Sequence, residues 1–316
     1  AISKVEAQRE ALDFLIDGVV IKVTDLETRR ALGYTDKFPR WAVAFKFAAE
    51  EATTVLERVT WDVGRSGKLT PLAHVSPVDF AGVTVRRATL NNYGDIQRKR
   101  LTLGSTVFIR RSNDVIPEIL GKVEDGIAGE EIEKPDTCPA CGSALVETGA
   151  HLFCLNREGC KPQVIARLTH FCSREAMDIE SLSEKTLEVL YEHLSVREPQ
   201  DLYQLTADRL IGLPGFQHKK AEKVVEALNI SRDCQLDAFL LAIGIPNIGR
   251  ATARDLALHF GSLQALREAA AEQLQEVPEV GGVVAAGIVE FFADPLYAHM
   301  VDALLQAGVR PRDMAP

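Results

Sequence analysis

The sequence has no run of about twenty apolar residues, the length that a membrane-spanning helix needs. Its first residues, AISKVE, contain neither a cationic start nor an apolar stretch, so we do not expect a signal peptide. These two absences predict a protein of the cytoplasm with no membrane partner. The lack of an initiator Met indicates a sequence that starts inside a longer chain.

The sequence also has no excess of positive charge. Its 36 Lys and Arg residues face 45 Asp and Glu residues, which gives a formal net charge of −9. This balance weighs against a protein that holds nucleic acid by bulk positive charge. It leaves DNA binding open, because backbone N–H groups at helix N-termini and in glycine turns can hold phosphates without a lysine.

At 316 residues the chain is too long for one ordinary domain, and its patterns predict a multidomain α+β protein. Residues 17–23 and 41–47 are apolar runs that predict two strands, too few for a complete domain. From about residue 53 to 132, short β-rich runs broken by Gly and Pro indicate a small barrel of the OB-fold type. Beyond residue 163 the chain is predicted to be helical nearly to its end.

Four of the six cysteines fall in one short window. They form two pairs, namely Cys138 with Cys141 and Cys154 with Cys160. Four thiolates complete a tetrahedral Zn²⁺ site without an open position, so we predict a structural metal that supplies folding free energy to this segment. The alternatives are four unrelated thiols, a redox pair, or His151 as a replacement ligand. We expect His151 to be a solvated loop residue instead.

The helical part contains an internal repeat. Residues 213–216, 245–248 and 277–280 have the sequences LPGF, IPNI and VPEV, start 32 residues apart, and each precede an apolar helix. The pattern is typical of helix-hairpin-helix turns, in which glycines allow positive φ and leave N–H groups free for a DNA phosphate. The predicted DNA-binding glycines are Gly215, Gly249 and Gly281. An ordinary α-hairpin array is the alternative, and a fainter copy near Ile179 is expected only to pack.

Two lysines interrupt the apolar strands near the N-terminus. If Lys22 and Lys46 are buried, each ammonium needs an anionic partner. A nucleotide phosphate is the functional candidate, with Asp17 placed to position a metal ion or the reacting groups. Structural salt bridges, or lysines that extend to solvent, explain the residues equally well.

Arginines form two further candidate sites. Arg65 lies between glycines in the sequence VGRSG, where backbone and guanidinium could approach a phosphate closely. Arg110 and Arg111 form a second small basic cluster. Either site could equally be a solvated turn charge.

Taken together, the segments resemble the bacterial NAD-dependent DNA ligase family. The match covers nearly the whole chain in the family's order. It rests on DGVVIKV at 17–23, PRWAVAFKF at 39–47, VGRSG at 63–67, Ala88-Thr89-Leu90 with Asn92, Arg110-Arg111, DVIP at 114–117, the four cysteines and the hairpin array.

The resemblance implies an enzyme that seals nicks in duplex DNA, with NAD as adenylate donor and Mg²⁺ for phosphoryl transfer. It implies that Lys22 and Lys46 contact the adenylate phosphate, with Asp17 in the same pocket. Arg65 would contact DNA phosphates or the reacting centre. The implied domains are the end of an adenylation (nucleotidyltransferase) domain at 1–50, an OB-fold at 51–132, a four-cysteine zinc module at 133–163 and a helix-hairpin-helix domain at 164–312.

The sequence also departs from the family pattern. The family's adenylated lysine belongs to a Lys-x-Asp-Gly motif that does not occur here, and Asn113 stands where the family has Gly. The nicotinamide-recognising and BRCT domains are also missing, so we expect that this chain cannot adenylate itself. We also expect a monomer. The rival interpretations are a non-catalytic duplex-DNA adaptor built from the same modules and, less favoured by the hairpin array, an RNA-directed protein.

Overall fold

The computed structural model describes residues 2–8, 11–12, 16, 18–35, 38–47, 50–80, 83–111 and 117–314. The chain divides into two compact units. The first comprises residues 1–62, 70–134 and 148–152, and the second comprises residues 63–69, 135–147 and 153–316.

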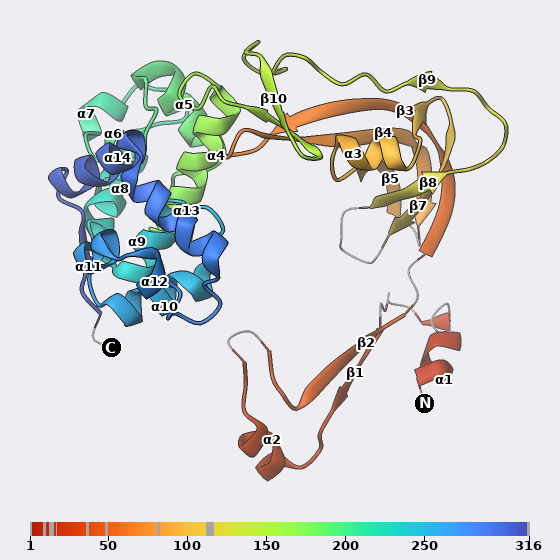
Figure 1. Ribbon diagram of the computed structural model, residues 1–316, viewed down its shortest axis with the longest axis horizontal. Coiled ribbons are helices and arrows are strands. Elements are labelled where there is room, and N and C mark those ends of the chain that lie inside the picture. The colour runs from red at the N-terminus through yellow and green to blue at the C-terminus, as the bar shows by residue number, and fades with distance from the viewer. Residues whose placement is uncertain are drawn as a thin grey trace. The chain divides into compact units, whose positions relative to one another are not determined.

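The N-terminal part of the first unit contains a two-stranded ribbon. Helix α1 (Ile2–Ala7) comes first, and helix α2 (Leu26–Leu32) lies between strands β1 (Gly18–Lys22) and β2 (Ala42–Lys46) (Figure 1). The strands pair antiparallel over their whole length. Both predicted strands are therefore confirmed. No further strand of the described chain pairs with the ribbon. Several of its apolar side chains are therefore exposed, namely Val20, Ile21, Val43 and Phe45.

A closed five-stranded barrel forms the rest of the first unit, as Figure 1 shows. Its strands are β3 (Glu50–Val63), β4 (Lys68–Phe80), β5 (Val83–Thr89), β7 (Thr106–Arg111) and β8 (Glu118–Lys122). They follow the order β4-β3-β7-β8-β5, and a pairing between β4 and β5 closes the barrel. Alternate residues point inward, as in the buried, half-buried alternation along β4. The predicted barrel is confirmed.

Helix α3 (Tyr93–Arg98) closes one part of the barrel core. Asn92 caps it by accepting from the Asp95 backbone N–H at 2.8 Å, and Ile96 packs into the core. The buried Asp95 carboxylate holds Lys99 at 2.7 Å, and Lys99 also donates to the Ile119 carbonyl at 2.7 Å. This network connects the helix to β8. Strands β6 (Thr102–Leu103) and β9 (Glu130–Glu131) form a separate short antiparallel pair, in which β6 precedes β7 and β9 follows β8 along the chain.

The tip of the β3–β4 hairpin, residues 63–69, belongs to the second unit. There the Cys154 N–H donates to the Gly67 carbonyl at 2.8 Å. Cys154 ends strand β11 (His151–Cys154), which pairs with β10 (Leu145–Thr148) and adjoins β4 in the sheet order. The hairpin tip and the cysteine segment are thus parts of one sheet.

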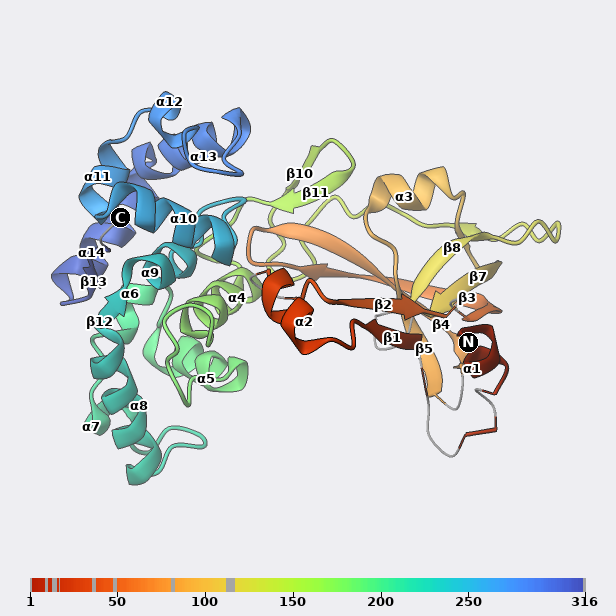
Figure 2. The same ribbon diagram turned by 90° about the horizontal axis from the view of Figure 1, so that it is seen from below.

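Helices make up the remainder of the second unit (Figure 2). They are α4 (Lys161–Cys172), α5 (Glu184–Leu194), α6 (Pro199–Leu202), α7 (Ala207–Leu210), α8 (His218–Ser231), α9 (Leu236–Ala242), α10 (Arg250–Phe260), α11 (Leu263–Glu268), α12 (Ala271–Leu274), α13 (Gly282–Ala293) and α14 (Pro295–Gln306). One continuous apolar core joins them, from Val164 to Val309. Strands β12 (Asp233–Gln235) and β13 (Arg310–Arg312) pair in parallel and attach the C-terminal segment.

Among the described helices, none is long and apolar enough by itself to cross a membrane. Helices α13 and α14 meet that criterion only as a pair, with a 68° bend between them. Their inward faces carry Ile288, Phe291, Val301 and Leu304 of the helical core.

Candidate functional site: cysteine cluster and hairpin turns

The four clustered cysteines converge on one point. Their Sγ atoms all lie within 4.8 Å of one another, with 3.5 Å between Cys141 and Cys154 and 3.9 Å between Cys138 and Cys160. Four thiolates at the usual Zn–S distance of about 2.3 Å would be about 3.8 Å apart. The donor set and its spacing therefore fit a tetrahedral zinc ion. His151 is not part of the group; it starts strand β11 and is half-buried.

Local structure explains how the chain forms this cluster. After Cys138 the chain turns back on itself at Gly142, whose φ is +72° and whose N–H donates to the Cys138 carbonyl at 2.8 Å. Cys160 is the N-cap of α4 and is fully buried. Burial raises the pKa of the Cys154 thiol to about 12, whereas contacts with Ser143 outweigh burial and lower the pKa of Cys141 to about 6. A divalent cation would favour the thiolate at every position.

The three repeated turns have the same backbone geometry. Gly215, Asn247 and Glu279 all adopt left-handed conformations, with φ of +74°, +62° and +63°. They stand 32 residues apart, the interval that the sequence repeat predicts. A left-handed conformation was expected for Gly215 and Asn247. It was not expected for Glu279, because glutamate rarely adopts positive φ.

The second glycine of the pattern has a different role from the expected one. Gly249 and Gly281 have φ of −96° and −81°, so they do not supply a left-handed turn. They are the N-caps of α10 and α13, and Gln217 is the N-cap of α8. Within the described chain, no N-cap side chain of these three helices accepts from its helix N-terminus. Their first N–H groups are therefore not occupied by a cap side chain, and the positive end of the helix dipole favours an anion there.

The fourth, fainter copy provides an internal comparison. Ser181 is left-handed with φ of +67°, so this turn has the same backbone form. Ser183 then caps α5 by accepting from the Thr186 N–H at 3.4 Å, and Glu184 puts a negative charge in the first turn. Because the helix end is already satisfied and acidic, this copy is unsuited to an anion, consistent with a packing role.

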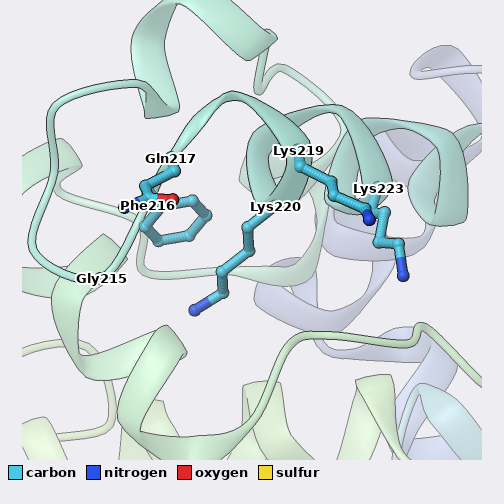
Figure 3. Close-up of a pocket in the computed structure, with 6 residues that line it drawn as sticks. All are labelled: Gly215, Phe216, Gln217, Lys219, Lys220 and Lys223. Atoms are coloured by element: carbon cyan, nitrogen blue, oxygen red, sulfur yellow. The ribbon is translucent and has the colours of Figure 1, made fainter.

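The first turn also carries three lysines around an open pocket of about 580 Å³ (Figure 3). Lys220 is half-buried, with its Nζ 4.5 Å from the centre of the Phe216 ring and 3.3 Å from Thr186 Oγ1. Lys219 and Lys223 are exposed and extend in the same direction from the helix. This turn therefore adds two available cations to its free N–H groups. The sequence analysis did not predict these two lysines as binding residues. Their position directly after the turn is the signal that could have identified them.

The predicted arginine sites lie in different surroundings. Arg65 is exposed in the β3–β4 turn, which the Gly64 N–H closes by donating to the Lys68 carbonyl at 2.9 Å. Arg110 on β7 is 3.4 Å from Glu118 on the neighbouring strand β8, in a half-exposed ion pair. The side chain of Arg111 is outside the described part. A role in DNA binding stays a prediction for all three arginines.

The two strand lysines share one face of the ribbon. Lys22 pairs with Ala42 and Lys46 with Gly18, so they lie at opposite ends of that face, about 13 Å apart along the strands. Both side chains are exposed, so the ammonium groups are not buried in this ribbon, and the functional role of the two lysines stays a prediction. The reason is that neither face of the ribbon is covered by described residues. Asp17 lies outside the described residues.

Comparison with known proteins matches four segments of the chain. Residues 1–50 match the NAD-dependent DNA ligase adenylation domain, and residues 53–131 match the NAD-dependent DNA ligase OB-fold domain. Residues 173–229 match a SAM-like helix-hairpin-helix tandem, and residues 238–301 match a helix-hairpin-helix motif. Two of these segments are thus similar to domains of the NAD-dependent DNA ligase family.

Relatives named DNA ligase support this assignment. One from Alkaliphilus oremlandii is 54% identical over 311 residues, which is 98% of this chain and 47% of the relative. One from Clostridium perfringens is 51% identical over 301 residues, or 95% of this chain and 46% of the relative. The chain thus spans about half the length of the curated relatives it matches. All four hairpin copies fall within the two matched helix-hairpin-helix regions.

Proposed function

We propose that this chain is the DNA-holding part, and one portion of the adenylate-handling site, of an enzyme that seals nicks in duplex DNA during replication and repair with NAD as adenylate donor. The observation that carries the proposal is the set of three left-handed turns followed by helix N-termini without side-chain caps. A duplex backbone presents phosphates at regular spacing to such N–H groups, and these contacts read no sequence.

We assign four domains to this function. They are the end of the adenylation domain at 1–50, the OB-fold at 51–132, the four-cysteine zinc module at 133–163 and the helix-hairpin-helix domain at 164–312. The zinc ion would have a structural role, because four thiolates leave it no open coordination position. We further propose a monomeric protein that acts in the cytoplasm, where its DNA substrate is.

The proposed chemistry uses the exposed face of the N-terminal ribbon. Lys22 and Lys46 would contact the adenylate phosphate and neutralise charge that develops during phosphoryl transfer, with Asp17 in the same pocket. Mg²⁺ would share that role. Arg65 would contact DNA phosphates or the reacting centre, and Arg110 and Arg111 would contact DNA phosphates alongside Gly215, Gly249 and Gly281 of the hairpin turns.

The decisive experiment measures sealing of a nicked duplex that already carries a 5′-adenylate. The chain is assayed alone and with the unmatched part of the Alkaliphilus oremlandii ligase added in trans. Joining that depends on this chain supports the proposal. Failure to join in both mixtures, with binding to nicked duplex intact, favours the DNA-binding adaptor instead.

A variant pair then tests the lysine assignment. In the joining mixture, Lys46→Ala should abolish sealing and leave DNA binding nearly unchanged. Arg30→Ala is the control, because Arg30 is also an exposed cation of the ribbon segment but lies on α2, away from the paired strands. Wild-type sealing by Lys46→Ala would contradict the assigned role.

A further inference from the structure

A second pocket, of about 310 Å³, lies wholly within the second unit. Five separate stretches of that unit line it: the β3–β4 turn, helix α4 with the residues before it, the start of α6, the end of α9 with the turn that precedes α10, and helix α14. The charged and polar side chains of the lining include Arg65, Arg157, Arg167, His170, Asn247 and Tyr297. Among the described lining residues none is acidic.

Two of the arginines share one carboxylate. Arg167 Nη2 is 2.9 Å from Glu198 Oε1, and Arg157 Nη2 is 3.6 Å from Glu198 Oε2. Arg157 is also fixed by its guanidinium, which lies 4.1 Å from the centre of the Tyr297 ring, and its carbonyl accepts from Arg167 Nη1 at 2.9 Å. With Arg65, three guanidinium groups line the pocket, and two of them share the Glu198 carboxylate.

Arg157 and Arg167 also have N–H groups that make no hydrogen bond. Within the described chain, Arg157 Nε and Nη1 and Arg167 Nε are buried without a hydrogen-bond acceptor. Burial, partly opposed by Glu198, lowers the pKa of the Arg167 guanidinium below its ordinary value. A buried, unsatisfied N–H of a charged group is costly, and an anion with several acceptor oxygens would relieve both the charge and the missing hydrogen bonds.

We propose that this pocket binds one phosphate group between the guanidinium groups of Arg65, Arg157 and Arg167. The planar forks of arginine match the oxygen spacing of phosphate, and the volume is ample for one such group. Asn247, the left-handed residue of the second hairpin turn, lines the same pocket, so a phosphate of the duplex backbone can reach it. Only this choice of source rests on the proposed function, since a free phosphate-bearing molecule has the same chemistry.

The first test is a titration of inorganic phosphate into the full chain at constant ionic strength, with binding followed by calorimetry and by NMR signals of the arginine side chains. Arg65→Gln should weaken phosphate binding about tenfold, as expected for loss of one charge-assisted contact. Arg209→Gln is the matched control, because Arg209 is an exposed arginine of α7 that does not line the pocket. Arg65 is exposed, so its variant is expected to fold.

The second variant is Arg167→Gln, with circular dichroism as a check on folding, and it should bind phosphate still more weakly. Competition with an intact duplex then identifies the source of the phosphate. Displacement of phosphate by DNA assigns the pocket to the DNA backbone, and its retention assigns the pocket to a free phosphate-bearing molecule. Absence of phosphate binding, or equal binding by the Arg65 and Arg209 variants, overturns the proposal. Phosphate binding by a chain that binds no DNA would refute the proposed function and leave the pocket standing.

Discussion

Gly67→Ala is the substitution whose effect the structure defines most sharply. Gly67 has φ of +78°, and its carbonyl accepts the Cys154 N–H at 2.8 Å. An added Cβ would overlap the Cys154 carbonyl oxygen and come within 3.1 Å of Gln163 Oε1. The Cys154 carbonyl also accepts from Gln163 Nε2 at 3.0 Å. The added methyl group must therefore separate the hairpin tip from the end of strand β11.

The magnitude follows from two contributions. Left-handed backbone costs an L-residue about 1–2 kcal/mol, and loss of one or two buried hydrogen bonds costs about 1 kcal/mol each. We therefore expect Gly67→Ala to lower the free energy of unfolding by about 2–4 kcal/mol. Gly104→Ala is the control: Gly104 has φ of +77°, and its added Cβ would meet no atom within 4 Å. It should lose only the backbone contribution of about 1–2 kcal/mol.

The assay is urea unfolding of the zinc-loaded chain, together with the rate of zinc release to a chelating dye. Gly67→Ala should destabilise the second unit and accelerate zinc release, because Cys154 is both the hydrogen-bond donor and a proposed zinc ligand. Gly104→Ala should leave zinc release unchanged. Equal stability losses, or equal zinc release, would refute the coupling between the hairpin tip and the metal site.

Three further predictions concern the barrel and the hairpins. Burial alone raises the pKa of Asp95, but hydrogen bonds from Lys99, Arg98 and Asn91 outweigh it and leave that pKa below its ordinary value. The barrel should therefore keep this stabilisation above about pH 4 and lose it as pH falls through the lowered pKa, and Asp95→Asn should flatten that part of an acid-unfolding curve. Glu279→Gly should raise the free energy of unfolding by about 0.5–1 kcal/mol in thermal melts, because glycine relieves the left-handed strain at a small entropic cost. Replacing both Lys219 and Lys223 by Gln should lower the salt slope of duplex binding by about 2, since each lysine–phosphate contact releases about 0.9 counterion; an unchanged slope would remove these lysines from the interface.

Features set by local chemistry could be predicted from the sequence. A metal that needs four thiolates requires four cysteines at short spacing, and the window from Cys138 to Cys160 leaves little choice of partners. The hairpin turns could be located because Gly215 and Asn247 tolerate left-handed backbone, whereas Glu279 is recognisable only by its register with them. The barrel could be predicted because short β-rich runs broken by Gly and Pro are also a local signal.

Features that depend on distant neighbours could not be predicted. The apolar flanks of Lys22 and Lys46 left open whether these lysines are buried, because burial requires a covering layer, which the two-stranded ribbon does not have among the described residues. The arginine pocket was missed altogether, because Arg65, Arg157 and Glu198 come from remote segments that no sequence pattern links. Only the tertiary structure brings such charges together.

In the proposed function, the three hairpin turns would hold DNA in different ways, and this would reconcile DNA binding with a net charge of −9. All three turns have N–H groups without a side-chain cap. Such groups can hold a phosphate without a protein cation, so few counterions are released from the DNA. The first turn adds Lys219 and Lys223 and the second adds Arg250, whereas the third has Gly282 and the exposed Val283 at the start of its helix. The salt dependence of binding should therefore arise mainly from the first two turns. A change at the third turn should alter affinity at every salt concentration alike.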